Sequence, residues 1–282
     1  MLGRTSSAPQ GSARLAERRR VRRRRILVSL FVLFALLCAG ILYELNQSAV
    51  RISHIQIFGA DQSYADIAVA AMQGKYFGVI PRDSTFFFPD TGIRAGIMAA
   101  HPDVAAVSIF HNGLTGLSIK TSERVPIARW CGLAPTPGVE AYCYVFDANG
   151  FVFAAAATTT ETVNSFTLYA PLDGDGLEPL RATIAHADDL PSVFDFARQL
   201  PSFGSPVTHI IIRNDEVDTY LASGTRITYV LGNEENAFTA LTSARGSLNL
   251  ADGSLDYVDL RFDGKVYAKR KVDSAQKTVN SQ

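Results

Sequence analysis

ILVSLFVLFALLCAGILY, residues 26–43, is the stretch that decides how the rest of the chain is arranged. It contains no charged residue and lies between Arg25 and Glu44. As an α-helix, a run of this length rises about 27 Å, close to the roughly 30 Å of a bilayer's hydrocarbon core. A lone segment in lipid must be helical, because its backbone polar groups have to pair internally. We therefore predict a transmembrane helix at residues 26–43.

Two other interpretations of this segment stay open. An arginine-rich start before an apolar run is also typical of a cleaved secretory signal, although this run is longer than a usual signal core and no small-residue cleavage site follows it. Leu37, directly before Cys38, is too large for a lipoprotein processing site. The third interpretation is a buried helix of a soluble domain.

The residues before this segment are strongly basic. Residues 1–25 hold nine arginines and one acidic residue, Glu17, whereas the formal net charge of the whole chain is zero. The rest of the chain is therefore acidic overall, which argues against a nucleic-acid binder with a distributed basic face. The arginines could bind nucleic acid or anionic lipid, but their position beside the apolar segment favours a topology signal. We predict a single-pass type II protein of the cytoplasmic membrane, with residues 1–25 cytoplasmic and the bulk of the chain extracytoplasmic.

The cysteines fit an oxidising compartment outside the cytoplasm. Cys38 lies within the apolar segment, and Cys131 and Cys143 flank a stretch that includes Pro135, Pro137 and Gly138. Two cysteines around a turn predict a hairpin disulfide in such a compartment. Two unpaired buried thiols are the alternative. A zinc site is disfavoured, because the stretch between the two cysteines contains no histidine.

Residues 50–122 show the patterns of a compact β-α-α-β-β module with two helices on one face of a three-stranded sheet. Alternation, helix-capping and turn signals place the elements at residues 51–58 (strand), 63–74 and 90–101 (helices), and 104–110 and 114–120 (a hairpin around Asn112-Gly113).

Residues 123–270 change to short apolar runs, which predict a mainly antiparallel β domain with two helices. The strands are expected at 125–131, 142–146, 151–155, 166–169, 207–213, 217–221, 226–231, 257–262 and 265–269, and the helices at 190–200 and 233–245. The whole chain is therefore of the α+β class, and the polar tail at 271–282 is predicted to be disordered.

Signatures of catalysis are missing from the sequence. It contains no G-x-S-x-G, H-E-x-x-H, Walker loop or paired C-x-x-C. The five histidines are scattered without the spacing of metal ligands. Residues 173–178, DGDGLE, match only part of a calcium loop and favour a turn. We predict that the protein is not an enzyme and takes no cofactor, metal or small-molecule substrate.

The last predicted strand offers a different kind of site. A strand at the end of a sheet has one partner, and in residues 265–269 Val266 and Ala268 alternate with Lys265, Tyr267 and Lys269. The lysines can protect this edge against unwanted pairing. The unpaired N–H and C=O groups can also dock an extended segment of another protein. The pattern alone leaves both interpretations open.

The order of these motifs resembles the FtsQ/DivIB family of bacterial cell-division proteins. The resemblance covers about residues 14–270 and is carried by ISHIQIFG (52–59), HPDV (101–104), LSIKTSERVPIA (117–128), Trp130, YVFD (144–147) with GFVF (150–153), and YVDLRF (257–262). The pair Cys131 and Cys143, with its longer loop, departs from the family pattern and leaves the local shape of the β domain open there.

This resemblance implies a POTRA domain at residues 50–122 and a β domain at 123–270. It implies a non-enzymatic scaffold at the division septum that recruits and holds the FtsB and FtsL membrane subcomplex, and links it to septal peptidoglycan synthesis. In the family, the last β hairpin pairs with a strand of FtsB. Carried over by motif, the implied partner-binding residues are Phe262, Lys265, Val266 and Tyr267, with Asp259 and Arg261 orienting the hairpin.

Two other functions stay open at this point. A POTRA-containing protein of another export or envelope-assembly route would be expected to carry several such modules or a β-barrel behind them. A membrane-anchored extracytoplasmic enzyme would show a turnover that depends on a particular Asp, Glu or His.

Overall fold

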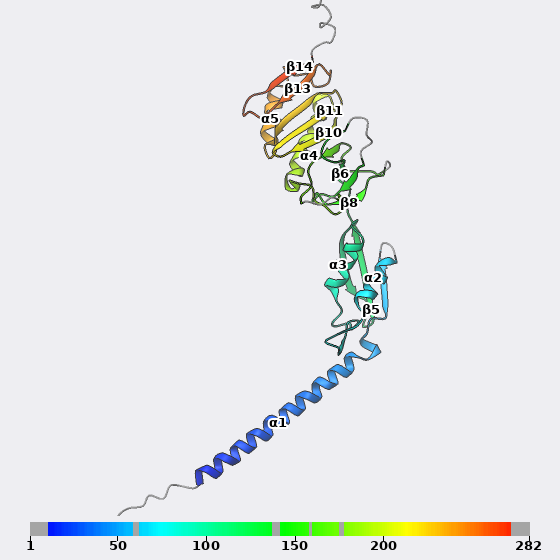
Figure 1. Cartoon of the computed structure of the whole chain (residues 1–282), viewed down its shortest axis with the longest axis vertical. Coiled ribbons are helices and arrows are strands. Elements are labelled where there is room, and N and C mark those ends of the chain that lie inside the picture. The colour runs from blue at the N-terminus through cyan, green and yellow to red at the C-terminus, as the bar shows by residue number, and fades with distance from the viewer. Residues whose placement is uncertain (1–10, 59–61, 137–141, 158–159, 175–177, 272–282) are drawn as a thin grey trace, which may run out of the picture. The chain divides into compact units, whose positions relative to one another are not determined.

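The computed structural model describes residues 11–58, 62–136, 142–157, 160–174 and 178–271, and the side chains from residue 18 onward. The described chain contains both helices and mixed sheets, so the α+β class is confirmed (Figure 1). It divides into unit 1, Met1–Ala100 with Ala106–Ser122, and unit 2, His101–Ala105 with Glu123–Gln282. The tail predicted to be disordered lies, from residue 272 on, outside the described residues.

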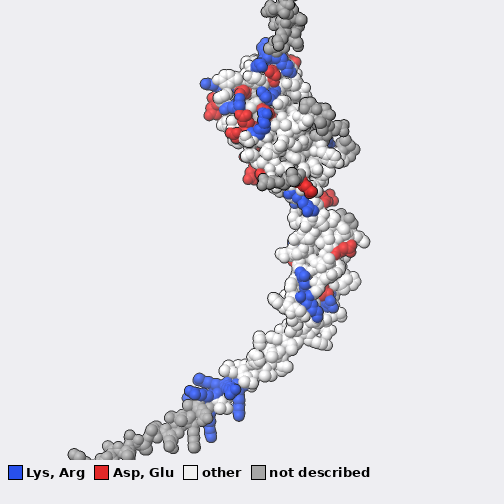
Figure 2. All heavy atoms as spheres, viewed as in Figure 1, with Lys and Arg blue, Asp and Glu red and all other residues white. Residues whose placement is uncertain are grey.

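A single long helix, α1 (Gly11–Leu45), begins the described chain. Over Arg18–Leu45 it is the one helix of the described residues that is long and apolar enough to cross a membrane. Its apolar side chains are exposed, and Figure 2 shows basic side chains gathered near its start with none along the following apolar part. The helix extends beyond the predicted 26–43 at both ends, because arginine is itself a good helix former and no breaker separates the two parts.

Unit 1 contains the predicted order β-α-α-β-β with one addition. Its elements are β1 (His54–Phe58), α2 (Ser63–Ala71), β2 (Lys75–Tyr76), β3 (Ile80–Pro81), α3 (Asp90–Ala100), β4 (Val104–His111) and β5 (Gly116–Glu123). The three-stranded sheet has the order β1-β5-β4, with β1 parallel to β5, and β2 and β3 form a separate small hairpin. The sequence did not predict this hairpin, because two-residue strands are too short to show alternation. Helices α2 and α3 pack on each other, and Ile93 and Ile97 of α3 are fully buried.

Unit 2 is built on a nine-stranded sheet of order β14-β13-β12-β11-β10-β9-β6-β7-β8. The strands are β6 (Ala128–Trp130), β7 (Tyr144–Phe146), β8 (Val152–Ala155), β9 (Thr167–Tyr169), β10 (Val207–Arg213), β11 (Glu216–Leu221), β12 (Arg226–Val230), β13 (Leu255–Asp259) and β14 (Tyr267–Arg270), and the helices are α4 (Leu190–Gln199) and α5 (Glu234–Ser243).

The sheet of unit 2 is mixed, with more antiparallel than parallel pairs of neighbouring strands. Strands β9 and β10, β12 and β13, and β6 and β9 pair in parallel, whereas the other neighbours are antiparallel. Parallel neighbours need a crossover connection, usually a helix. Helix α4 lies in the connection from β9 to β10, and α5 lies in that from β12 to β13. The two predicted helices therefore provide the crossovers of these two parallel pairs.

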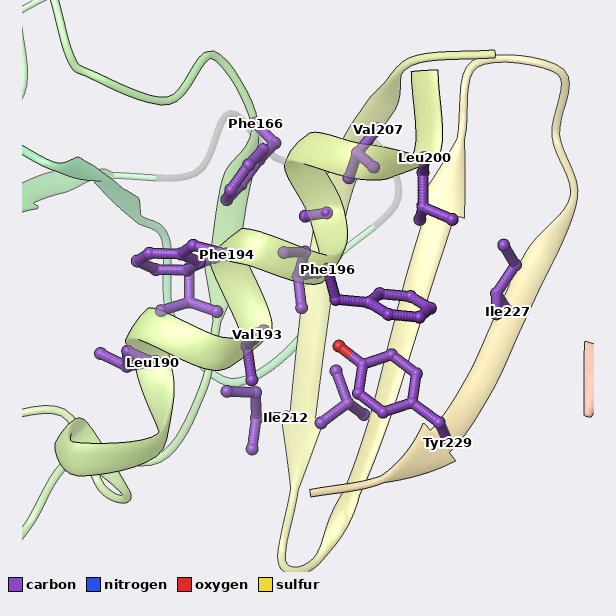
Figure 3. Close-up of a cluster of buried hydrophobic side chains, with 14 of the residues drawn as sticks. Phe166, Leu190, Val193, Phe194, Phe196, Leu200, Val207, Ile212, Ile227 and Tyr229 are labelled. Carbon is purple, nitrogen blue, oxygen red and sulfur yellow. The ribbon is translucent and has the colours of Figure 1, made fainter. Parts of the chain in front are cut away.

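The core of unit 2 lies between the helices and one face of this sheet. Figure 3 shows α4 crossing the strands, with the ring of Phe196 facing that of Tyr229. The two ring centroids are 4.5 Å apart, and both side chains are almost completely buried. Phe238 of α5 contacts Phe196 edge to face, so both helices share one apolar layer. Burying an aromatic side chain of this size stabilises a fold by about 1.5–3 kcal/mol.

The predicted hairpin disulfide is confirmed. The sulfur atoms of Cys131 and Cys143 are bonded, and their Cα atoms are 4.3 Å apart. Part of the enclosed loop, residues 137–141, lies outside the described residues. Within the described chain, Cys38 in α1 is the free cysteine, and no group of His, Cys, Asp and Glu side chains is arranged to hold a metal.

Replacing Phe196 by alanine should lower the free energy of unfolding of unit 2 by about 3–5 kcal/mol, because it leaves a cavity under α4 that neighbouring rings cannot fill. Urea unfolding of the full chain in detergent, followed by the fluorescence of its single tryptophan, Trp130, measures this loss. Gln199→Ala, an exposed position on the same helix, is the control and should change stability by no more than about 0.5 kcal/mol. Equal effects of the two variants would contradict the placement of α4.

The double variant Cys131→Ala and Cys143→Ala should lose about 3 kcal/mol of stability at most, because the unfolded chain is no longer constrained by the closed loop. Unfolding with and without a thiol reductant checks this, since reductant should affect only the parent. Cys38→Ser, which leaves the disulfide intact, should match the parent under both conditions. If the reductant opens the disulfide of the parent but leaves its stability unchanged, the prediction is contradicted.

Candidate partner-binding edge

The two edge strands of the sheet in unit 2 differ in how their outer backbone groups are hydrogen-bonded. At one end, the backbone of β8 is bonded by the chain's own residues: Val152 N–H donates to Ala182 O (2.9 Å), and Arg181 N–H donates to Val152 O (2.7 Å). At the other end lies β14, which pairs with β13 on one side. No strand among the described residues pairs with its other side. We call this outer side of β14 the open edge.

The hydrogen-bond register shows which backbone groups face the open edge. Leu260 N–H donates to Thr228 O on β12 (2.8 Å), so the alternate residue Val258 also directs its backbone toward β12. Its neighbours on β13 then face β14, which makes Tyr267 and Lys269 the inward-bonded residues of the last strand. The backbone N–H and C=O of Ala268 therefore point outward, into the open edge.

Two aromatic side chains stand beside the open edge. Phe262 and Tyr267 contact each other edge to face, with ring centroids 5.5 Å apart, and each is about half exposed. All four side chains of β14 are exposed. A free backbone edge flanked by accessible rings is the arrangement that β-strand addition uses, since main-chain bonds supply affinity and side chains supply selectivity.

An ion-pair network holds the turn that precedes β14. Arg261 donates to both carboxylate oxygens of Asp259 (3.0 and 2.7 Å) and to Glu216 Oε1 on β11 (2.6 Å). The carboxylate of Asp259 also accepts the backbone N–H of Arg261 (3.1 Å). The hydrogen bond from the guanidinium lowers the pKa of Asp259 below its usual range, and the two carboxylates raise the pKa of Arg261. The turn is thus tied to a strand that is not its sheet neighbour.

A depression of about 580 Å³ opens beside this turn. It is lined by Val266, by Asp263 and Gly264 of the turn, and by one side of α5. Val266 is partly buried and packs against the core, so its side chain anchors the start of β14. A partner segment that continues beyond the open edge would find here a recess bounded by the helix.

The structure places the six sequence-predicted partner residues in two groups. Asp259 and Tyr267 lie opposite each other on β13 and β14. The other four, Arg261, Phe262, Lys265 and Val266, lie on the connecting segment rather than on strands. This differs from the predicted strands at 257–262 and 265–269, because Lys265 N–H bonds back to Phe262 O (3.1 Å) around Asp263-Gly264 and delays the second strand by two residues.

Sequence reasoning missed residues that the pairing brings to this site. Glu216 lies 45 positions before Arg261, and no local pattern links the two. Asp218 is buried on the same sheet face, where it pairs with Arg213 and accepts Thr228 Oγ1 (2.6 Å). The two acidic residues at alternate positions of β11, Glu216 and Asp218, are the signal that could have indicated a polar sheet face.

Comparison with models of protein families gives no match. None of the curated proteins matches the chain either.

The stability that the network gives to the hairpin should depend on pH. Because the pKa of Asp259 in the folded state lies below its unfolded value of about 3.9, the ionised carboxylate stabilises the fold above that pH, and the contribution is lost as the pH falls through the folded pKa. Arg261→Gln should therefore destabilise the protein most near neutral pH, and the difference from the parent should shrink below about pH 4.

Urea unfolding from neutral pH down to about pH 3 measures this difference. Arg245→Gln is the control, because Arg245 donates to the backbone oxygen of Ser202 rather than to a carboxylate. Its effect should not shrink with acid. If the loss of unfolding free energy in Arg261→Gln is the same at every pH tested, the prediction is contradicted.

Proposed function

We propose that this protein is a membrane-anchored, non-enzymatic adaptor that binds an extended segment of a partner protein by β-strand addition at the open edge. The observation that carries the proposal is the contrast between the two ends of one sheet. The chain covers β8 with its own residues but, in its described part, offers the backbone of β14 without a second strand. The protective interpretation of the lysines fits less well, because Phe262 and Tyr267 add accessible apolar surface at this place.

Helix α1 is the proposed anchor. Its arginine-rich start would stay in the cytoplasm by the positive-inside rule, and both units would lie outside. The disulfide between Cys131 and Cys143 supports this topology, because such bonds persist in oxidising compartments.

The sequence resemblance gives the proposal its biological setting. We propose that the protein acts as an FtsQ/DivIB-type component of the division septum, with unit 1 as its POTRA domain and FtsB and FtsL as its partners. The strand order β1-β5-β4 with two helices supports a single module of this kind. The contacts with an FtsB-type strand would then fall on β14 and on the turn that carries Phe262, Lys265 and Val266.

Replacing Ala268 by proline should strongly weaken binding of the partner while leaving the fold intact. Proline removes the outward N–H and places a ring on the open edge, and proline is tolerated on edge strands where the N–H faces solvent. We expect at least a tenfold weaker complex, since an unpaired backbone acceptor on the partner costs roughly 1–3 kcal/mol. Co-purification with the FtsB-type protein of the same bacterium, quantified by titration, measures the loss.

Ala268→Val is the matched control, because valine keeps the N–H and favours extended backbone. It should bind as the parent does. A fluorescent fusion gives the cellular test: the parent should form a band at mid-cell, and a uniform peripheral signal would count against the septal setting. Binding of Ala268→Pro at parental strength, with unfolding unchanged, would refute strand addition at this edge.

A further inference from the structure

Unit 1 exposes four apolar side chains near the short strand β3, two before it in the chain and two after it. Phe77 and Val79 lie in the turn between β2 and β3, and Phe86 and Phe87 follow β3 closely. Their exposed fractions are 97%, 45%, 64% and 48%. We call these four residues the apolar patch of unit 1. Four exposed apolar side chains within eleven residues of the chain indicate a surface that contacts an apolar environment.

Backbone contacts connect the apolar patch to the end of α1. The helix contacts β3, and its last residue, Leu45, is buried. Beyond the helix, Thr85 N–H donates to Val50 O (3.0 Å), and Ile52 N–H donates to Asp83 O (2.7 Å). The segment that leaves α1 is thus pinned to residues 83–85, directly before Phe86 and Phe87.

The length of α1 sets the depth of this contact in a bilayer. Counted from Ile26, the first residue after the arginines, a helix reaches Leu45 after a rise of about 30 Å, which is the thickness of the hydrocarbon core. Leu45 would therefore lie at the outer boundary of the hydrocarbon. Strand β3, which contacts the helix, and the apolar patch on both sides of it would lie in the adjoining headgroup layer.

The conformation of Phe77 points the same way. Its φ is +50°, that of Gly78 is +75°, and Val79 N–H bonds back to Tyr76 O (3.0 Å), as in a tight hairpin turn with both central residues left-handed. Such turns favour Asn-Gly, because a bulky side chain is strained at positive φ. Phe77 is thus an aromatic residue in a strained backbone conformation, and its side chain is almost completely exposed. Backbone strain of this kind often marks a functional surface.

We propose that the apolar patch of unit 1 inserts into the interface of the extracytoplasmic leaflet and holds this unit against the membrane. Aromatic rings prefer the headgroup level, where one part of the environment is apolar and the other is wet. Lys75, exposed on β2, supplies a positive charge for anionic headgroups. The inference rests on the proposed membrane anchor α1 but is independent of strand addition at β14.

The test uses the full chain in vesicles of phosphatidylcholine and phosphatidylglycerol whose acyl chains carry bromine close to the headgroup. Bromine quenches tryptophan only at short range. Phe77→Trp should show a blue-shifted emission and at least about twofold stronger quenching than the parent, whose single tryptophan is buried in unit 2. Phe58→Trp is the matched control, because Phe58 is also half exposed but is the last residue of β1, whereas the bonds to residues 83–85 come from Val50 and Ile52, before that strand. It should not be quenched beyond the parent.

Flotation of the same vesicles separates the two proposals. If Phe77→Trp floats with lipid while its added tryptophan remains unquenched, the insertion is overturned, the anchor is kept and the patch is assigned to a protein partner. Protein that fails to float overturns the anchor and the insertion together. In detergent, Phe77→Asn should melt at or above the parent temperature, because asparagine suits the turn; a clearly lower melting temperature would show that Phe77 serves folding and would contradict the proposal.

Discussion

The structure of unit 2 depends on one constraint: every backbone N–H and C=O of a sheet needs a partner or water, and a sheet of finite width has two ends where partners run out. At β8 the segment around Arg181 and Ala182 satisfies that need from within the chain. At β14 the described residues do not. In its described part, the chain therefore covers one end of the sheet with its own backbone and not the other. The core does not require this asymmetry, and the adaptor proposal is based on it.

The same sheet explains why the hairpin of β13 and β14 has a defined geometry although β14 is short. Helix α5 lies in the crossover that places β13 beside β12, and it packs through Phe238 against Phe196 and through that ring onto the sheet. The turn before β14 is then fixed from the opposite face by Arg261, which connects Asp259 on β13 with Glu216 on β11. The hairpin is therefore held from both faces, by apolar packing on one and by charge pairing on the other.

Much of the fold could be predicted from sequence. The features that could not be predicted share one cause. The apolar run at β10 is predicted with the bounds Val207–Arg213, and α4 is placed to within a residue. These elements are encoded by local periodicity. The parallel pairing of β12 with β13, and the ion pair between Glu216 and Arg261, join residues far apart in the chain, and local patterns carry no information about such partners. The candidate site could be predicted as a region, but the outward-facing backbone of Ala268 follows only from the register.

The shortness of β14 has a consequence for its dynamics. This strand has four residues and, among the described residues, one neighbouring strand, so few interstrand hydrogen bonds hold it. It should therefore open by local fraying long before the sheet unfolds globally. Amide hydrogens of Tyr267 and Lys269 would then exchange quickly in the free protein. A bound segment would make β14 an interior strand of the sheet. Binding of the segment and ordering of β14 would then be thermodynamically linked, and each would favour the other.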